Sequence, residues 1–591
     1  MITRRYFRRN GGRPSGSPTR QKWGAPVYRG RPHLFIAILT LGALLRVPAF
    51  FTPLLSDDEA IYATTADAMQ RGDALYRDVV DHKPPAIYDI YRAAFAVFGQ
   101  YQTHGAHLFV LLAVLATAWA LCSAARRIRG DARDGDIAAL LWVVFSTTWH
   151  DYDALAANCE LFLVLPQAWA FAILLRAKKI GSFALAGFLV GLSATLKYQG
   201  FTFLGVIAFA LLLDVVQHRV TILRAIGLYI VAKTASVAPL GLYAMSYALA
   251  GNLDAAVFWF IFNFTYISAG FTGFTAAFRF LMRLAMIGGV AIAAYGFGFL
   301  GAIHAARNGV SEIRTRTLTD TTRAQLLAVA WFLTSAIALI PGGRYFGHYF
   351  HLILPAVCVL AAIPLRRFWA ATPASASAPA EDFNAKAQRR KDPRNETSSL
   401  GVSAPLRKIP APASAPAPAS TRRALIVFLI AAPALTFFLL STALRPWAQS
   451  LDDPQPPYET VAARVRTLTF PDDRIFVWGN SPQMYVFARR PMGSRFSFCN
   501  YLTGEASSDK SASDRPTDKG RGLDDAWTML FDDLDRKKPR LFIDAARAGW
   551  DGYAAFPIAN YPRLATYLEE HYRLIERVEG VAIYLRNDLS D

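Results

Sequence analysis

The sequence predicts a helical protein that crosses a membrane many times and ends in a soluble α/β domain. Of its 591 residues 53% are hydrophobic, and they gather in long blocks such as 34–45 and 424–444. Blocks of about 20 apolar residues match the hydrocarbon thickness of a bilayer. After residue 444 the long blocks stop, and short strand-like and helix-like segments follow.

The basic residues lie beside the apolar blocks. The net charge is +19, with nine Lys/Arg and no acid in residues 1–32, and eleven Lys/Arg against four acids in residues 366–423. Such clusters hold loops in the cytoplasm, so the charge indicates topology and argues against a nucleic-acid partner. We expect a basic cytoplasmic tail over 1–32 and a disordered, Ala/Pro-rich cytoplasmic linker over 366–423.

Counting crossings from a cytoplasmic N-terminus predicts about eleven transmembrane helices. A transmembrane module over 33–365 holds ten of them, and the last one, 424–443, places the C-terminal region 444–591 outside. Every basic cluster beside a helix then falls on the cytoplasmic side. The expected spans are about 33–52, 107–125, 136–149, 160–176, 181–196, 200–216, 222–249, 280–305, 324–341, 350–365 and 424–443.

The stretch 85–99, which follows the first span, is apolar but is not counted as a crossing. At about 1.5 Å per residue it is too short, and it carries Asp89 and Arg92. Pro84 and Pro85 suit a helix start, where a missing N–H is harmless. We expect an interfacial helix in the first outer loop.

The C-terminal region alternates strands and helices. The segments 474–479, 539–545 and 580–586 are typical of buried strands, and 561–572 is typical of a helix. A short helix is expected after Pro482, with Ser481 as its N-cap. The polar run 505–522 predicts a mobile loop.

Three consecutive acids, Asp57, Asp58 and Glu59, follow the first span. One interpretation is a helix N-terminus, where Ser56 and acidic residues are favoured. The other is a carboxylate held at the membrane surface as a general base. The two are compatible, because one acid can cap the helix while the next does chemistry.

Cationic side chains also occur at the outer ends of the predicted helices. Lys83, preceded by His82, is either a lysine that extends to the interface or a contact for a lipid phosphate. Arg344, with His348 nearby, is either a membrane anchor or a phosphate clamp, and Lys197 has the same two interpretations.

Further polar residues precede the fourth span. Asp151 and Asp153 have a spacing that is weak evidence for a metal site, and Glu160 follows. The four cysteines are scattered, so we expect neither a disulfide framework nor a zinc site. No Gly-rich loop follows a strand, so no nucleotide site is expected, and we predict no metal and no other cofactor.

The first outer loop resembles that of the GT-C glycosyltransferases, in the branch of the protein O-mannosyltransferases and lipid A aminoarabinose transferases. The matching elements, within a resemblance over about 33–365, are Asp58-Glu59 with Tyr62, Gly72-Asp73, Lys83-Pro84-Pro85 and Phe98-Gly99.

This resemblance implies transfer of a sugar from a polyprenyl-phosphate donor on the outer leaflet, with inversion. Asp58 matches the catalytic aspartate of these enzymes, and Lys83 matches the lysine near the donor phosphate. Asn158 stands where several relatives have an aspartate, with Glu160 two residues further on. The implied partners are the lipid donor, membrane lipids and a protein, lipid or glycan acceptor, at the inner or plasma membrane.

Two other functions are compatible with a phosphate-binding outer face. A carrier or flippase for lipid-linked glycans would place its charges midway inside helices, whereas these lie at helix ends. A sensor with an outer ligand-binding domain would not require both Asp58 and Lys83. The sequence therefore favours the transferase.

Overall fold

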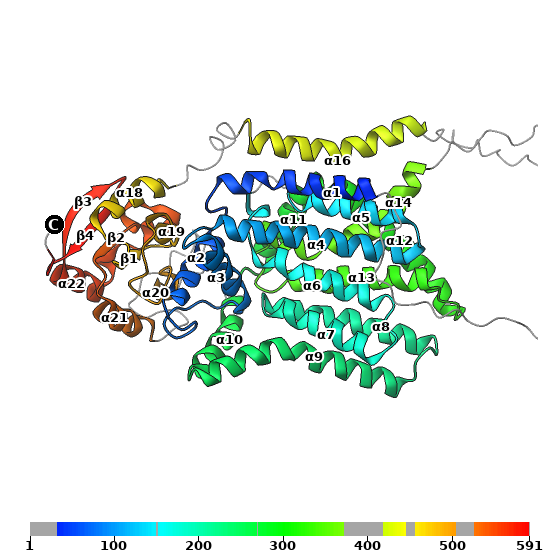
Figure 1. Ribbon diagram of the computed structural model, residues 1–591, viewed down its shortest axis with the longest axis horizontal. Coiled ribbons are helices and arrows are strands. Elements are labelled where there is room, and N and C mark those ends of the chain that lie inside the picture. Colours follow the sequence, from blue (N-terminus) through cyan, green and yellow to red (C-terminus); the bar gives the residue numbers. More distant parts are fainter. Residues whose placement is uncertain are drawn as a thin grey trace, which may run out of the picture.

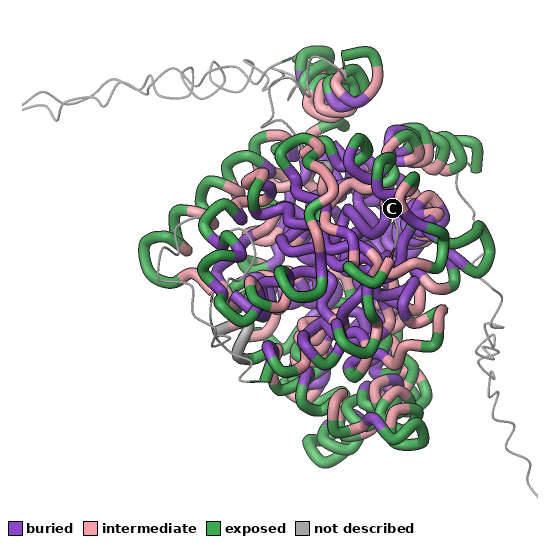
Figure 2. Tube along the Cα trace, turned by 90° about the vertical axis from the view of Figure 1, so that its left-hand side faces the viewer, coloured by how far each residue is buried: buried purple, intermediate pink, exposed green. Residues whose placement is uncertain are grey.

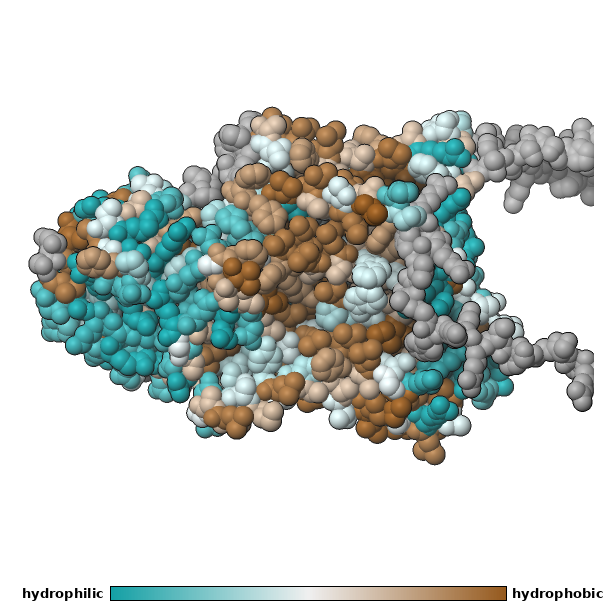
Figure 3. All heavy atoms as spheres, in the orientation of Figure 1, coloured by the Kyte–Doolittle hydropathy of each residue, from teal (hydrophilic) through white to brown (hydrophobic). Residues whose placement is uncertain are grey.

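The structure is a computed structural model that describes residues 32–148, 152–268, 270–370, 418–444, 456–503 and 525–589. A helical bundle lies at one end and an α/β domain at the other, with α2 (Asp57–Gln70) and α3 (Ala86–Phe98) between them (Figure 1). The bundle exposes a broad hydrophobic surface, whereas the visible face of the α/β domain is largely hydrophilic (Figure 3). Buried residues fill the centre of the molecule (Figure 2).

The bundle is built from twelve of the helices found among the described residues. Their bounds are α1 Pro32–Leu45, α4 His104–Arg129, α5 Ala132–Phe145, α6 Cys159–Leu174, α7 Ile180–Ala194, α8 Leu204–Val216, α9 Ile222–Leu249, α11 Gly273–Val290, α12 Ile292–Arg314, α13 Asp320–Leu339, α14 Leu354–Ala370 and α16 Ala419–Ser441. A further helix, α10 (Leu253–Ser268), and short 3₁₀ turns connect them; these turns are η1 Val47–Phe51, η2 Tyr152–Ala154, η3 Tyr198–Phe203 and η4 Gly347–Leu352.

Within the described part of the chain, seven helical segments are long and apolar enough to cross a membrane. They are Pro32–Phe51, His104–Arg129, Tyr198–Val216, Ile222–Leu249, Gly273–Val290, Asp320–Leu339 and Ala419–Ser441. Shorter apolar helices lie beside them, at Cys159–Leu174, Ile180–Ala194 and Leu253–Phe264. The predicted fold class, a polytopic helical membrane protein with a C-terminal α/β domain, is confirmed.

One predicted span is divided in two. The helix expected at 280–305 is α11 followed by α12, and Ala291 between them has φ −97° and ψ 29°, outside the helical range. Gly288 and Gly289 lie in the last turn of α11, and glycine has a low helix propensity. The sequence therefore weakens the helix just before the break.

Small residues let neighbouring helices approach closely in the bundle. A Cβ placed on Gly187 of α7 would lie 2.0 Å from the carbonyl oxygen of Ala232 in α9, and one on Gly301 of α12 would lie 2.1 Å from that of Leu360 in α14. Close approach at small residues is a main source of packing energy between transmembrane helices.

The C-terminal domain contains a four-stranded sheet in the order β1-β2-β4-β3. β1 (Ile475–Trp478) is parallel to β2 (Leu541–Asp544), and β4 (Val581–Arg586) is antiparallel to both β2 and β3 (Tyr572–Val578). Its helices are α18 Tyr458–Leu468, α19 Gln483–Ala488, α20 Asn500–Thr503, α21 Ala526–Lys537 and α22 Pro562–His571.

Three strands and two helices of this domain were expected, and β3 was not. β3 is an edge strand with several partly exposed positions and charged residues, so it lacks the continuous apolar pattern of β1 and β2. The predicted N-cap is wrong: the Ser481 hydroxyl donates to Asp551 Oδ2 at 2.8 Å, and Pro482 occupies the cap position.

Several predicted segments lie outside the described residues. These are the basic tail except its last residue, most of the linker, the loop 505–522 and Asp151. The flanking helices run slightly into the predicted linker, because α14 continues to Ala370 and α16 begins at Ala419.

Candidate active site

The acidic triplet begins α2, and its cap is the one expected. Ser56 has extended backbone angles, and its hydroxyl accepts from the backbone N–H of Glu59 at 3.4 Å. Asp57, Asp58 and Glu59 occupy the first turn, where carboxylates favour the helix dipole. Successive residues point about 100° apart on a helix, and the three side chains accordingly meet three different surroundings.

Asp58 faces Lys83. Its Oδ1 accepts from Lys83 Nζ at 2.7 Å, and its Oδ2 accepts from the Tyr62 hydroxyl at 3.2 Å. The Lys83 ammonium also lies 4.6 Å from the centre of the Tyr62 ring. The structure therefore brings together Asp58 and Lys83, the two residues with the central roles in the predicted site.

Glu59 is fully buried, and its contacts are with other residues than Lys83. Its Oε2 accepts from the backbone N–H of Leu55, and its Oε1 accepts from that of Ala157, each at 2.6 Å. Its Oε1 also lies 3.0 Å from His107 Nε2. Glu59 thus ties the start of α2 to the segment before α6, which is a structural task.

Asp57 points to a third partner, in the C-terminal domain. Its Oδ1 accepts from Gln483 Nε2 at 2.6 Å. Gln483 is the first residue of α19. Asp57 therefore joins α2 to the α/β domain directly beside Asp58.

A second lysine–carboxylate pair lies near the first. Lys197, just before η3, contacts Glu160 Oε1 in the first turn of α6 at 2.5 Å. Its ammonium also lies 3.7 Å from the centre of the Tyr349 ring. Both charges of this pair are buried or nearly so.

His348 of η4 connects to the first pair. Its Nδ1 lies 2.6 Å from Asp153 Oδ2, and its Nε2 lies 3.9 Å from Asp58 Oδ2. Asn158 fixes Asp153 from the other side, because its Nδ2 donates to Asp153 Oδ1 at 2.8 Å, and its Oδ1 accepts from Ser56 at 3.3 Å. The Asn158 amide thus holds the neighbouring carboxylate of Asp153.

Neighbouring charges set the protonation states of Asp58, Lys83 and His348. Burial raises the pKa of Asp58, but the positive charges of Lys83 and His348, with a smaller effect of Lys197, outweigh it and lower the pKa to about 2. Burial lowers the pKa of Lys83, but Asp58 reverses this and raises it well above its ordinary value. Burial likewise lowers the pKa of His348, but Asp153 outweighs it and raises the pKa to about 9. At neutral pH Asp58 is ionised, and Lys83 and His348 are protonated.

The remaining predicted residues have different surroundings. Arg344 is buried at the turn before η4, and its carbonyl accepts from Arg279 Nε at 3.3 Å. Its role as a phosphate clamp stays a prediction. His82 is buried and faces Tyr501 of the C-terminal domain, whose hydroxyl lies 3.2 Å from His82 Nδ1. In the described residues no group of three His, Cys, Asp or Glu side chains is arranged to hold a metal ion.

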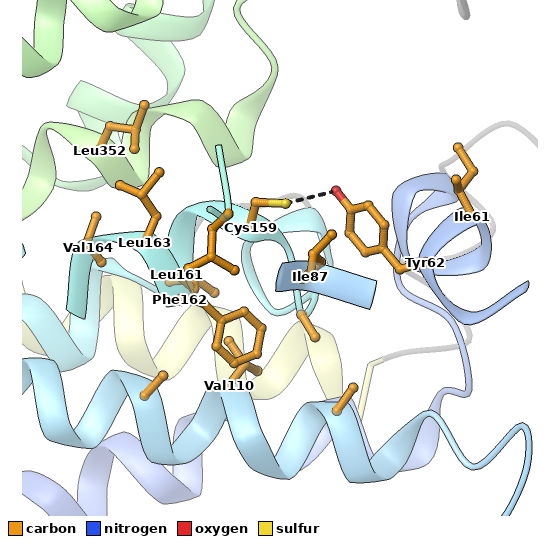
Figure 4. Packing of buried hydrophobic residues seen from close by; sticks show 14 of the residues in the cluster. Ile61, Tyr62, Ile87, Val110, Cys159, Leu161, Phe162, Leu163, Val164 and Leu352 are labelled. Carbon is orange, nitrogen blue, oxygen red and sulfur yellow. Dashed lines mark hydrogen bonds between the residues drawn. The ribbon is translucent and has the colours of Figure 1, made fainter. Parts of the chain in front are cut away.

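An apolar core supports the polar site. Tyr62 of α2 points toward Cys159 at the start of α6, whose thiol donates to its hydroxyl at 3.4 Å, and Ile87 of α3 lies beside them (Figure 4). The four cysteines of the chain are buried and free. Asp58 therefore stands on a helix that packs against α3 and contacts the start of α6 through Tyr62.

Comparisons with known proteins agree with this fold. Residues 82–240 match the family described as dolichyl-phosphate-mannose-protein mannosyltransferase. No curated protein sequence matches the chain.

Solved structures match over most of the chain. ArnT from Cupriavidus metallidurans is 14% identical, with a TM-score of 0.54 for the structure bound to undecaprenyl phosphate and 0.56 for the apo state. In both cases the match covers 94% of this chain and 97% of ArnT. The apo oligosaccharyltransferase of Archaeoglobus fulgidus is 12% identical with a TM-score of 0.50, over 94% of this chain and 74% of that one.

These findings define the fold of the protein. The chain has the GT-C glycosyltransferase fold, and the resemblance read from the first outer loop is confirmed. More particularly, the solved structure most like it among these three is ArnT in the apo state.

Proposed function

We propose that this protein is a membrane glycosyltransferase that moves a sugar from a polyprenyl-phosphate donor to an acceptor hydroxyl on the outer side of the membrane. The observation that carries the proposal is the contact of 2.7 Å between Asp58 and Lys83 at the start of α2. It joins a carboxylate suited to accept a proton to a cation suited to contact a phosphate.

In the proposed reaction the acceptor oxygen attacks the anomeric carbon from the side opposite the phosphate. The bond between that carbon and the phosphate oxygen breaks, the electron pair leaves with the phosphate, and the sugar is inverted. Asp58 takes the proton of the attacking hydroxyl. Phosphate is a good leaving group, so positioning and charge stabilisation carry most of the catalysis.

Three cations near Asp58 support a phosphate site. Lys83, Lys197 and protonated His348 all lower the pKa of Asp58, which supports a shared location around this carboxylate. A phosphate that draws Lys83 toward itself would weaken the contact with Asp58 and raise the pKa of Asp58. Donor binding would then strengthen the base in time for the transfer.

The direct test is mass spectrometry of surface glycans from cells with and without the gene. We expect a glycan mass that disappears on deletion and returns with the wild-type gene, and its composition identifies the sugar and the acceptor. An unchanged set of surface glycans would contradict the proposed function.

Lys83→Ala is expected to impair donor use more than the chemical step. Loss of charge-assisted hydrogen bonds typically costs about 1.5–3 kcal/mol, so KM for the donor should rise by about tenfold or more. The measurement is initial rate against donor concentration with purified protein and the donor identified above. Activity should return partly at high donor concentration; a lower kcat with unchanged KM would contradict a binding role.

Donor binding is expected to weaken as the pH rises through about 9. The pKa of His348 is raised to about 9, so its positive charge is present at neutral pH and is lost above that value. The measurement is binding of undecaprenyl phosphate between pH 7 and 10. Asp153→Asn removes the main cause of the raised pKa and should move the loss of binding to lower pH. Equal pH profiles for the two proteins would exclude His348 from the phosphate site.

We further propose that the N-terminus is cytoplasmic and the C-terminal domain lies outside. The end of α14 and the start of α16 lie at the end of the bundle away from that domain (Figure 1). In intact cells an impermeant thiol reagent should label Glu579→Cys, which is exposed on the domain, but not Arg314→Cys, which is exposed at the end of α12. The native cysteines are buried, so they should give little background. Labelling of both positions from outside would contradict this topology.

A further inference from the structure

We propose that the C-terminal domain completes the active site, with Tyr501 and Gln483 as positioning residues for the Asp58–Lys83 pair. The inference rests on the proposed function, because that function gives the pair its importance. The domain touches the chain next to each member of the pair, through Tyr501 on one side and Gln483 on the other.

Asp81, two residues before Lys83, is the centre of the first contact. Its carboxylate is fully buried. Oδ2 accepts from the Tyr88 hydroxyl of α3 at 2.7 Å, and Oδ1 accepts from the Tyr501 hydroxyl at 3.2 Å. Oδ1 also accepts from the backbone N–H of His82 at 2.7 Å. One carboxylate thus joins the bundle, the C-terminal domain and the residue beside Lys83.

His82 is held from several directions as well. Its Nδ1 lies 2.9 Å from Asp81 Oδ1 and 3.2 Å from the Tyr501 hydroxyl. Its carbonyl accepts from Asn263 Nδ2 of α10 at 3.0 Å. The two residues that precede Lys83 therefore have little freedom, and Pro84 follows directly.

The ring of Tyr501 is fixed by aromatic packing on α10. Its centre lies 5.2 Å from that of Trp259 and 5.9 Å from that of Phe262. The Trp259 Nε1 donates to the carbonyl of Tyr76, and the Tyr76 hydroxyl donates to the carbonyl of Lys83 at 2.7 Å. Tyr501 thus belongs to a packed polar and aromatic cluster that ends on Lys83.

The backbone of the loop is attached to the same domain. The N–H of Val80 donates to the carbonyl of Arg495 at 3.1 Å. Arg495 is itself held by two contacts of its guanidinium with the fully buried carboxylate of Asp533, at 2.8 and 3.0 Å. The domain therefore holds the loop through a firmly anchored residue.

The second contact lies beside Asp58. Gln483, at the start of α19, is buried and donates to Asp57 Oδ1 at 2.6 Å. The hydroxyl of Thr64, two turns further along α2, lies at 3.5 Å from the carbonyl of Pro482. The start of α19 thus fixes α2 close to the residue proposed as the base.

Both contacts restrict the distance between the Asp58 carboxylate and the Lys83 ammonium. Asp58 stands on α2 and Lys83 on the loop before α3, and the domain holds each element within one or two residues of the charged group. Catalytic groups need geometry within about 0.5 Å, so supporting residues affect function without touching substrate. An interface that only attached the C-terminal domain to the bundle would not need the buried carboxylate of Asp81, which both parts contact next to Lys83.

A double-mutant cycle on lipid-phosphate binding tests the inference. The measurement is the Kd of undecaprenyl phosphate for the purified full chain in nanodiscs. Tyr501→Phe removes one hydroxyl and is expected to weaken binding by about two- to tenfold. Lys83→Ala should weaken it by about tenfold or more. If Tyr501 acts through Lys83, the combined variant should match Lys83→Ala within about twofold.

Two further variants complete the design. Tyr88→Phe removes the other hydroxyl on Asp81 and should match Tyr501→Phe, which keeps the test valid if Tyr501→Phe does not fold. Tyr572→Phe is the control: this buried hydroxyl of the same domain donates to the carbonyl of Pro539 at 2.8 Å, and its loss should leave the Kd unchanged.

The outcomes separate the two proposals. Wild-type affinity in both Tyr501→Phe and Tyr88→Phe, or a full further loss when Tyr501→Phe is combined with Lys83→Ala, would overturn the inference and leave the proposed function intact. If Lys83→Ala itself binds like the wild type, the phosphate site is misplaced and both proposals are overturned.

Discussion

Asp58→Asn is expected to abolish sugar transfer while the protein stays folded and inserted in the membrane. The amide keeps the size of the side chain, and its oxygen still accepts from Lys83 or Tyr62, so the contacts at the start of α2 survive. It no longer takes a proton, and the loss of a positioned general base costs about 10²–10⁴-fold in rate. The measurement is transfer rate at saturating donor, with thermal unfolding as the check on folding.

The adjacent Asp57→Asn is the matched control. The amide still accepts a hydrogen bond from Gln483, so the change should affect transfer only mildly. If Asp57→Asn stops transfer and Asp58→Asn does not, the base is Asp57. If neither change matters, the acids serve only to begin the helix, and the chemistry must be sought at Glu160 or Asp153.

Glu59→Ala is expected to destabilise the fold strongly. The carboxylate is fully buried and accepts from the N–H groups of Leu55 and Ala157 beside its contact with His107. Removing it leaves these buried donors without an acceptor, and removing one partner of a buried charged network costs about 3–5 kcal/mol. The measurement is thermal unfolding in detergent, in which Glu59→Ala should unfold well below Asp58→Asn. A variant as stable as the wild type but without activity would instead make Glu59 part of the reaction.

The bundle could be predicted well from the sequence, because apolar length and flanking charge are local properties. The span 222–249 agrees with α9, and the helix expected at 85–99 is present as α3, although its position at the membrane surface stays a prediction. The break between α11 and α12 and the edge strand β3 were missed. Neither feature follows from hydrophobicity alone: the break comes after two glycines of low helix propensity, and β3 is partly exposed and charged.

The candidate site also has a part that could be predicted from the sequence and a part that could not. Asp58 and Lys83 lie 25 residues apart on two neighbouring elements, so a local motif is enough to pair them. The triplet alone could not show which acid faces Lys83, because that depends on the rotation of α2. Tyr501 lies 420 residues from Asp81, and nothing in its surrounding sequence marks it as a partner.

The charge balance around Asp58 has a consequence for turnover. Lys83, Lys197 and His348 contact or approach the carboxylates of Asp58, Asp153 and Glu160, and the buried carboxylate of Asp81 lies close to Lys83 as well, so the site holds no excess of positive charge for a phosphate. Under the proposed reaction the donor enters as a phosphodiester with one negative charge and leaves as a phosphomonoester whose second pKa is about 6. The spent carrier is then more anionic than the donor and should be held more tightly. Product inhibition by the lipid phosphate, rather than chemistry, would limit the steady-state rate.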